Sequence, residues 1–379
     1  MLQRSIIAVR LDVLVPSRNR SGLLARALES LLAAPIPPGL DVRVVVINNG
    51  STDSTAALLD WKVARYPGRI DVINERRRGK SRALNAAIVR STADLIGMID
   101  DDEEIDEGWY GEIYQAFQDP SLDFIGGPYR PRWSTPRPDW LPQEYLAVIG
   151  SVDSGPEARD FGPDFPGILK GGNAVIRREV LLRVGPYAEH LGPSGMARLL
   201  SCEDEEMYLR LLKAGARGRY LPTLIVHHHV CESRITPAYF RKWCFWRGVS
   251  RGLMDRAHPM PVAYLGGVPR FLYGRAAQAM FNLSARMLGS NRPRRLADEL
   301  SLWDLAGYWW GRHIYTLARY SPVRSRRNPR GTPSQSSGES WTLSCYPTHP
   351  YGQGSGGDDH HQACGCGVVE DRRASAPTR

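Results

Sequence analysis

The sequence is most informative at residues 95–106, which read Leu-Ile-Gly-Met-Ile-Asp-Asp-Asp-Glu-Glu-Ile-Asp. The apolar start, Leu95 to Ile99, predicts a buried strand, and the five acidic residues that follow would lie at its end. Carboxylates this close raise each other's pKa unless a cation intervenes, and hard oxygen ligands without a nearby cysteine suit Mg²⁺ or Mn²⁺. An ordinary solvated acidic turn is the alternative, but the position at a strand end favours a binding site.

The residues before this stretch alternate between two patterns. Short β-branched runs at 11–15, 44–47 and 70–73 predict strands, and helical spacing of apolar residues at 21–32, 54–64 and about 80–90 predicts helices between them. Such alternation is typical of an α/β fold with a mostly parallel twisted sheet and helices on both faces. Ligands of such sheets gather beyond the carboxyl ends of the strands.

Polar turns follow the predicted strands. The first strand leads into Pro16-Ser17-Arg18-Asn19, the second into the segment that begins at Asn48, and the third into Glu75 to Lys80. Because these turns share one edge of the sheet with the acidic run, they are the predicted surroundings of the site.

The second half of the chain has a different character. Residues 126–170 carry many Pro and Gly residues and predict irregular loops of the kind that shape an acceptor pocket. A helix is predicted over Glu205 to Ala214, and a short strand over Leu224 to Val226 that leads into three histidines. Residues 236–320 predict several basic, aromatic helices. From about residue 328 the composition predicts a disordered tail.

Composition and charge narrow the class of protein. The chain has 379 residues, 42% of them hydrophobic, which is enough for a large core. Residues 241–330 hold 17 Lys and Arg against four Asp and Glu, so this region could touch anionic lipid, nucleic acid or an acidic glycan, or simply be a solvated surface. Six scattered cysteines, no leader-like N-terminus and no apolar run of about 18 residues predict a cytoplasmic protein, at most peripheral on the inner face of the membrane.

Three ordered motifs carry a resemblance to a known family: Val13 to Arg20, Val46 to Asp53, and Ile99 to Asp102. Together they resemble glycosyltransferase family 2, and the likeness continues in Gly171 to Asn173, Cys202 to Glu205, and Pro222 to Val230. The resemblance implies a GT-A catalytic domain over residues 1–235, with a nucleotide-binding half at about 1–125 and an acceptor-binding half at about 126–235. A helical extension at 236–327 and the tail at 328–379 would follow.

The resemblance also implies roles for individual residues. Asp100 and Asp102 match the family's DxD motif, so Asp100 would hold the nucleotide and Asp102 would coordinate Mn²⁺ or Mg²⁺ with help from His228. Asp204 matches the catalytic base, a role that also suits a carboxylate between a helix N-terminus and three glutamates. The remaining candidates are nucleotide-sugar contacts at Pro16, Arg18, Asn19, Asn48, Lys80 and Asp101, and acceptor contacts at Gly171, Gly172, Asn173 and Glu203.

Two departures from the family pattern bear on specificity. Asn48 stands where the family usually has an aspartate that binds the nucleobase, so the base of the donor stays open. The Gln-x-x-Arg-Trp signature of processive relatives is absent, since Tyr239 to Trp243 has Tyr first and Lys fourth. Single-residue transfer is therefore favoured.

The expected function is an inverting, metal-dependent glycosyltransferase of surface polysaccharide or glycolipid synthesis. Its partners would be a nucleotide-diphosphate sugar and a glycan or lipid-linked acceptor. One alternative is a catalytically degenerate GT-A protein that binds nucleic acid or membrane as a basic scaffold. Another is a P-loop hydrolase around Gly79-Lys80-Ser81, which is disfavoured because Asn74 stands where that motif needs glycine.

Overall fold

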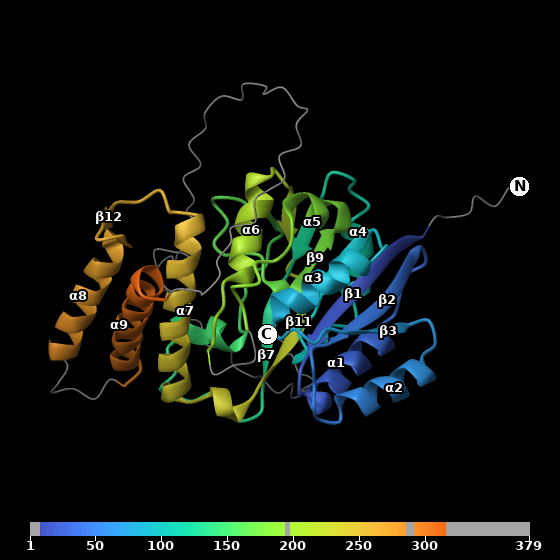
Figure 1. The fold of residues 1–379 in the computed structure, drawn as a ribbon, viewed down its shortest axis with the longest axis horizontal. Coiled ribbons are helices and arrows are strands. Elements are labelled where there is room, and N and C mark those ends of the chain that lie inside the picture. The colour runs from blue at the N-terminus through green and yellow to red at the C-terminus, as the bar shows by residue number, and fades with distance from the viewer. Residues whose placement is uncertain (1–7, 194–197, 286–291, 316–379) are drawn as a thin grey trace, which may run out of the picture.

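The computed structural model describes residues 8–193, 198–285 and 292–315 (Figure 1). Its centre is an eight-stranded sheet in the order β3-β2-β1-β4-β9-β6-β10-β8. The first four strands in this order are parallel, and β9 runs antiparallel to both of its neighbours. The strands are β1 (Val9–Ser17), β2 (Leu40–Asn48), β3 (Ile70–Asn74), β4 (Leu95–Met98), β6 (Phe124–Gly126), β8 (Arg159–Asp160), β9 (Ala174–Arg177) and β10 (Gly218–Tyr220).

Helices cover both faces of this sheet because side chains along a strand alternate between them. In β1, Leu11, Val13 and Val15 belong to one buried cluster and Leu14 belongs to another. The first cluster is completed by α1 (Ser21–Ala33), α2 (Thr55–Arg65) and α4 (Trp109–Ala116), and the second by α3 (Lys80–Arg90), α5 (Arg178–Val184) and α6 (Glu203–Lys213). The predicted α/β class, with its mostly parallel sheet and helices on both faces, is confirmed.

A second, three-stranded sheet differs from the sequence prediction. It contains β5 (Glu103–Ile105), β11 (Val226–Val230) and β7 (Tyr129–Trp133) in the order β5-β11-β7. The predicted strand at Leu224 to Val226 was wrong in its bounds, because the three histidines lie inside β11 and do not follow it. Since Val226, His228 and Val230 alternate on the buried side, the polar histidines do not end the strand.

The segment 126–170 is irregular as predicted, apart from β7, β8 and the 3₁₀ helix η1 (Gln143–Ile149). Two further 3₁₀ turns, η2 (Gly171–Asn173) and η3 (Glu232–Arg234), lie beside the site described below. Helix α6 begins at Glu203, two residues before the predicted start, so its first turn holds four acidic side chains.

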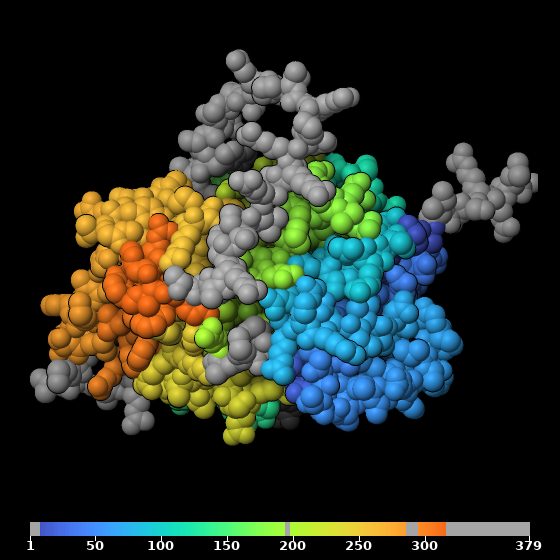
Figure 2. Space-filling model, viewed as in Figure 1, coloured from blue at the N-terminus to red at the C-terminus, as the bar shows by residue number. Residues whose placement is uncertain are grey.

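Three helices follow the sheets, as the sequence predicts for this region. They are α7 (Pro237–Ala257), α8 (Arg270–Ala285) and α9 (Arg292–His313), with the small hairpin β12 (Tyr264–Leu265) and β13 (Val268–Pro269) between the first two. Helix α7 lies beside α6, α9 packs against α7, and α8 packs against α9 at the outer edge (Figures 1 and 2). The predicted tail at 328–379 lies outside the described residues. Within the described ranges, every helix is too short or too polar to cross a bilayer.

Candidate active site

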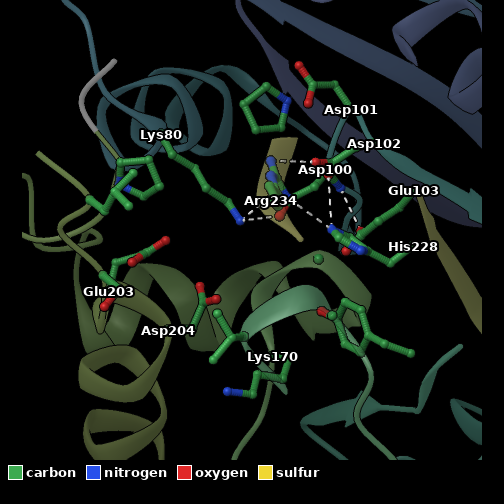
Figure 3. Close-up of a pocket in the computed structure, with 18 of the residues that line it drawn as sticks. Lys80, Asp100, Asp101, Asp102, Glu103, Lys170, Glu203, Asp204, His228 and Arg234 are labelled. Carbon is green, nitrogen blue, oxygen red and sulfur yellow. Dashed lines mark hydrogen bonds and ion pairs between the residues drawn. The ribbon is translucent and has the colours of Figure 1, made fainter. Parts of the chain in front are cut away.

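A cavity of about 450 Å³ opens at the carboxyl ends of β1 and β4, where the fold predicts ligands to gather (Figure 3). One wall comes from the polar turns after these strands, and the opposite wall comes from α6, η2 and α7. Ten of the predicted site residues line it, namely Pro16, Arg18, Lys80, Asp100, Asp101, Asp102, Gly172, Glu203, Asp204 and His228.

The acidic loop after β4 is held by cations and a hydroxyl. The Ser17 hydroxyl donates to Asp101 Oδ2 over 2.8 Å, and Arg20 Nη1 donates to Asp101 Oδ1 over 2.8 Å and to Asp102 Oδ2 over 3.0 Å. Arg234, from η3, donates to the same Asp102 oxygen over 3.0 Å. Two arginines therefore offset the repulsion among these carboxylates.

Burial and charge set the protonation of this loop. Burial raises the pKa of Asp101 to about 6, against the opposing charge of Arg20. Burial also opposes ionisation of Asp102, but the cationic groups around it, Arg234 and Arg20 among them, outweigh burial and lower the pKa to about 2. For His228, burial lowers the pKa below its ordinary value, so the imidazole is neutral near pH 7. The loop thus presents an ionised carboxylate next to a neutral imidazole.

Asp102 and His228 could share a metal ion. Asp102 Oδ1 lies 3.7 Å from His228 Nε2, a separation compatible with two ligands of one ion. Both arginines bond to the other carboxylate oxygen, Oδ2, but Arg234 Nη1 also lies 3.4 Å from His228 Nε2, so this contact would have to give way to an ion. Among residues 8–193, 198–285 and 292–315, no three His, Cys, Asp or Glu side chains are arranged to hold a metal. The protein donors therefore fit an ion only if a ligand such as a diphosphate completes the coordination.

Lys80 lies between the two walls of the cavity and bonds one of them (Figure 3). Its Nζ lies 2.6 Å from Asp100 Oδ1, and the Asp100 backbone N–H donates to Glu103 Oε2 over 2.8 Å. Burial alone would lower the pKa of Lys80, but the charges of Asp100, Asp204 and Glu203 raise it well above its ordinary value. Lys80 is therefore a fixed positive charge between the two acidic groups (Figure 3).

The opposite wall presents the first turn of α6. Asp204 Oδ1 is buried and, within the described structure, has no hydrogen-bond partner. Its neighbour Glu203 is buried as well, and burial together with Asp204 raises the pKa of Glu203 to about 8, so this carboxyl is protonated near pH 7. An unpaired carboxylate oxygen that faces a cavity can accept a proton from a bound hydroxyl.

Two glycines make room for these carboxylates. A methyl group at Gly171 would lie 2.1 Å from Asp204 Oδ1, and one at Gly172 would lie 2.4 Å from Glu103 Oε1. Only glycine permits such close approach of the η2 backbone. Gly171 is therefore adjacent to the proposed base although it is not among the cavity-lining residues.

Three of the predicted asparagines lie outside the cavity lining. Asn173 has no exposed surface, accepts from Trp109 Nε1 over 3.0 Å and donates to the Leu224 carbonyl over 2.6 Å, so it cannot contact an acceptor as predicted. Asn48 accepts from the Ser51 N–H over 3.0 Å, and Asn19 accepts from the Thr52 N–H over 2.7 Å. These two stabilise the turns after β1 and β2.

Several cavity residues were not among the predicted site residues, including Arg20, Asn49, Lys170, Arg234 and Trp243. Arg20 directly follows the quoted Asn19, so its motif was a usable signal. Asn49 accepts from the Gly79 N–H over 2.8 Å and thereby fixes the loop before Lys80. The position of Arg234 depends on the pairing of β11 with β5 and β7, which the sequence pattern does not specify.

Comparisons with known proteins agree with this geometry. Residues 12–185 match the family model described as glycosyl transferase family 2. The chain is 24% identical to a glucosyl-dolichyl phosphate glucuronosyltransferase of Haloferax volcanii over 64% of its own length and 76% of the relative. It is 26% identical to the succinoglycan biosynthesis protein ExoM of Rhizobium meliloti over 69% of its length and 82% of that protein.

A solved structure has a similar fold. It is a mannosyltransferase from Pyrobaculum calidifontis in complex with GDP-Man and Mn²⁺, with a TM-score of 0.55 and 18% identity. The match covers 80% of this chain and 87% of the mannosyltransferase. At this identity the likeness concerns the fold alone.

Proposed function

Because the chain belongs to glycosyltransferase family 2 through residues 12–185, we propose that it moves one sugar from a nucleotide-diphosphate sugar to an acceptor hydroxyl with inversion at the anomeric carbon. The observation that carries this proposal is the Asp204 carboxylate, which lines the cavity opposite the acidic loop and, within the described structure, has one buried oxygen without a hydrogen-bond partner (Figure 3). A donor held by the loop would present its anomeric carbon toward the wall that contains Asp204.

The proton transfer follows from this arrangement. As the acceptor oxygen forms its bond to the anomeric carbon, Asp204 takes the hydroxyl proton, and the bond to the diphosphate breaks with its electron pair on the departing oxygen. Since the acceptor attacks from the face opposite the leaving group, a single displacement inverts the centre. No covalent intermediate is required.

The donor's diphosphate would be held by cations. Arg20 and Arg234 already lie beside Asp102, and Lys80 lies beside Asp100. Three positive side chains would therefore lie near the departing nucleoside diphosphate, which carries negative charge. Guanidinium groups suit phosphate oxygens because they donate in pairs. Asp100, Asp101, Pro16 and Arg18 would contact the nucleoside on the same wall.

Asp102 and neutral His228 would hold Mn²⁺ or Mg²⁺ together with the diphosphate oxygens. When bound, the ion would neutralise charge on the leaving group. The support for this part of the proposal is the 3.7 Å separation of Asp102 Oδ1 from His228 Nε2, and neither arginine bonds Oδ1. Arg234, which lies 3.4 Å from His228 Nε2, would turn to the diphosphate when the ion binds.

The acceptor would enter past Gly172 and the aromatic side chains of Tyr239 and Trp243, which line the cavity from α7. Aromatic faces suit the apolar faces of sugar rings, so we propose a glycan or lipid-linked acceptor from surface polysaccharide or glycolipid synthesis. Two relatives, the glucosyl-dolichyl phosphate glucuronosyltransferase and the succinoglycan biosynthesis protein ExoM, are named for such substrates. The Tyr and Lys in the segment 239–243 favour single-residue transfer.

The proposal can be tested with a panel of nucleotides and nucleotide sugars. Thermal-shift measurements with and without Mn²⁺ should identify a nucleoside diphosphate that stabilises the chain more when the ion is present. The matching nucleotide sugar should then release its nucleoside diphosphate slowly to water and faster with an acceptor, and the product should have the inverted configuration. A retained configuration, or no response to any nucleotide, would refute the proposal.

A further inference from the structure

Helices α7 and α9 approach each other through four glycines, two on each helix and four residues apart. A methyl group at Gly307 would lie 1.9 Å from the Phe245 carbonyl oxygen, and one at Gly311 would lie 2.2 Å from that of Val249. On the partner helix, methyl groups at Gly248 and Gly252 would lie 2.2 and 2.5 Å from carbonyl oxygens of α9. Any side chain at these positions would push the backbones apart, so the two helices form one tightly packed unit.

This α7–α9 unit reaches the cavity along one face of α7. Tyr239 and Trp243 line the cavity itself, and Arg247 follows one turn later. Arg247 Nη2 lies 3.4 Å from Glu205 Oε1 in the first turn of α6, and its Nη1 lies 3.9 Å from Asp304 Oδ1 of α9. Arg247 therefore connects the helix pair to the turn that carries Asp204.

The pairing is largely sheltered from water. The side chains of Arg247 and Glu205 are each 18% exposed. Burial opposes ionisation of Glu205, but Arg247 and Lys170 lower its pKa below the ordinary value, so the carboxylate is charged near pH 7. A partly buried ion pair between fixed helices constrains geometry more than an exposed pair does.

The first turn of α6 depends on such external contacts. Cys202 precedes the helix with φ at 73°, a left-handed conformation that is unfavourable for a residue with a side chain, and no side chain caps the helix start. The loop before it is also tied to α7, because the Ser201 N–H donates to the Ser250 hydroxyl over 2.9 Å. Two contacts from α7 thus flank the residues that lead into Asp204.

We propose that Arg247 is a positioning residue, which fixes the first turn of α6 through Glu205 and thereby aims Asp204 at the acceptor hydroxyl. The α7–α9 unit then contributes to catalysis and is not only a basic, solvated surface. This inference rests on the proposed function, since it concerns the base of the same reaction.

The test compares Arg247 with Arg241, which lies on the same helix and bonds Glu299 of α9 over 2.6 Å. Within the described residues, Arg241 makes no hydrogen bond or ion pair with α6. Arg247→Met should lower kcat for release of nucleoside diphosphate from the sugar donor by about 10- to 100-fold, because a small displacement of a base costs that much. The Kd for the nucleoside diphosphate should stay within about two-fold, and Arg247→Lys should recover part of kcat. Arg241→Met should change neither quantity.

A double variant separates positioning from general destabilisation. If Arg247 acts through Glu205, adding Glu205→Gln to Arg247→Met should lower kcat no further than the single change does. The inference is overturned if Arg247→Met leaves kcat unchanged, if kcat and nucleotide affinity fall together, or if the two changes multiply. A wild-type chain that binds no nucleoside diphosphate would instead refute the proposed function, which is a different outcome from any result on Arg247.

Discussion

Two acidic clusters line opposite sides of the same cavity (Figure 3). The first cluster is Asp100 to Glu103 after β4, and the second is Glu203 with Asp204 at the start of α6. In the first cluster, Asp100, Asp101 and Asp102 all bond cationic side chains. In the second, Asp204 keeps a buried oxygen without a partner and Glu203 is neutral near pH 7. Similar composition thus gives a cation-rich wall suited to a diphosphate and a proton-accepting wall suited to a hydroxyl.

The largest expected effect comes from replacing Asp204, the proposed catalytic base of the second cluster. Asp204→Asn keeps the shape of the side chain but cannot accept a proton, so turnover should fall by about 100- to 10,000-fold. Nucleotide affinity should be unchanged, because the donor contacts lie on the other wall. Steady-state kinetics of nucleoside diphosphate release checks this, and a variant that keeps more than about a tenth of the wild-type rate contradicts the role of Asp204.

A substitution in the neighbouring 3₁₀ turn η2 should displace the same carboxylate of Asp204. In Gly171→Ala the new methyl group would lie 2.1 Å from Asp204 Oδ1, so the carboxylate must move. We expect a fall in kcat of about 10- to 100-fold, since catalysis depends on placement to within about 1 Å. Gly22→Ala is the matched control, because a methyl group there meets no atom within 4 Å. Equal rates for both variants would show that this contact does not position the base.

The smallest effect concerns stability as a function of pH. Burial and Asp204 raise the pKa of Glu203 from 4.5 to about 8, so between these values the folded chain keeps a proton that the unfolded chain releases. The free energy of unfolding therefore decreases as pH rises through this window. Glu203→Gln cannot ionise, so its stability should fall less between pH 5 and 8 in urea denaturation. Identical slopes for the two proteins would mean that Glu203 is ionised in the folded state.

The sequence predicted the fold well because strand and helix periodicities alternate clearly through the first hundred residues. The first acidic cluster could be singled out because a strand end is a local feature, whereas Asp204 was singled out by its match to the family's Glu-Asp pair. Of the two arginine partners of Asp102, Arg20 belongs to a motif that the sequence shows, but Arg234 could not be predicted, because it approaches only when β11 pairs between β5 and β7. Asn173 was misinterpreted for the same reason, as its burial against Trp109 and Leu224 depends on tertiary packing.

The glycine pairs of α7 and α9 are visible in the sequence, but they were not used to predict that these two helices pack together. Gly248 with Gly252 and Gly307 with Gly311 have a spacing that marks close helix contact, yet their partners lie about sixty residues apart in the chain. The predicted helices were confirmed in the described region. Their connection to the first turn of α6 emerged only from the three-dimensional arrangement.

The central claim is that the two acidic clusters have separate roles, and calorimetric titration of the nucleoside diphosphate with Mn²⁺ tests it most directly. Asp204→Asn should bind the nucleotide with wild-type affinity, whereas Asp102→Asn should bind it at least about ten-fold more weakly, because a ligand of the ion and the partner of two arginines is lost. Equal affinities for both variants, or weaker binding by Asp204→Asn than by Asp102→Asn, would contradict the claim.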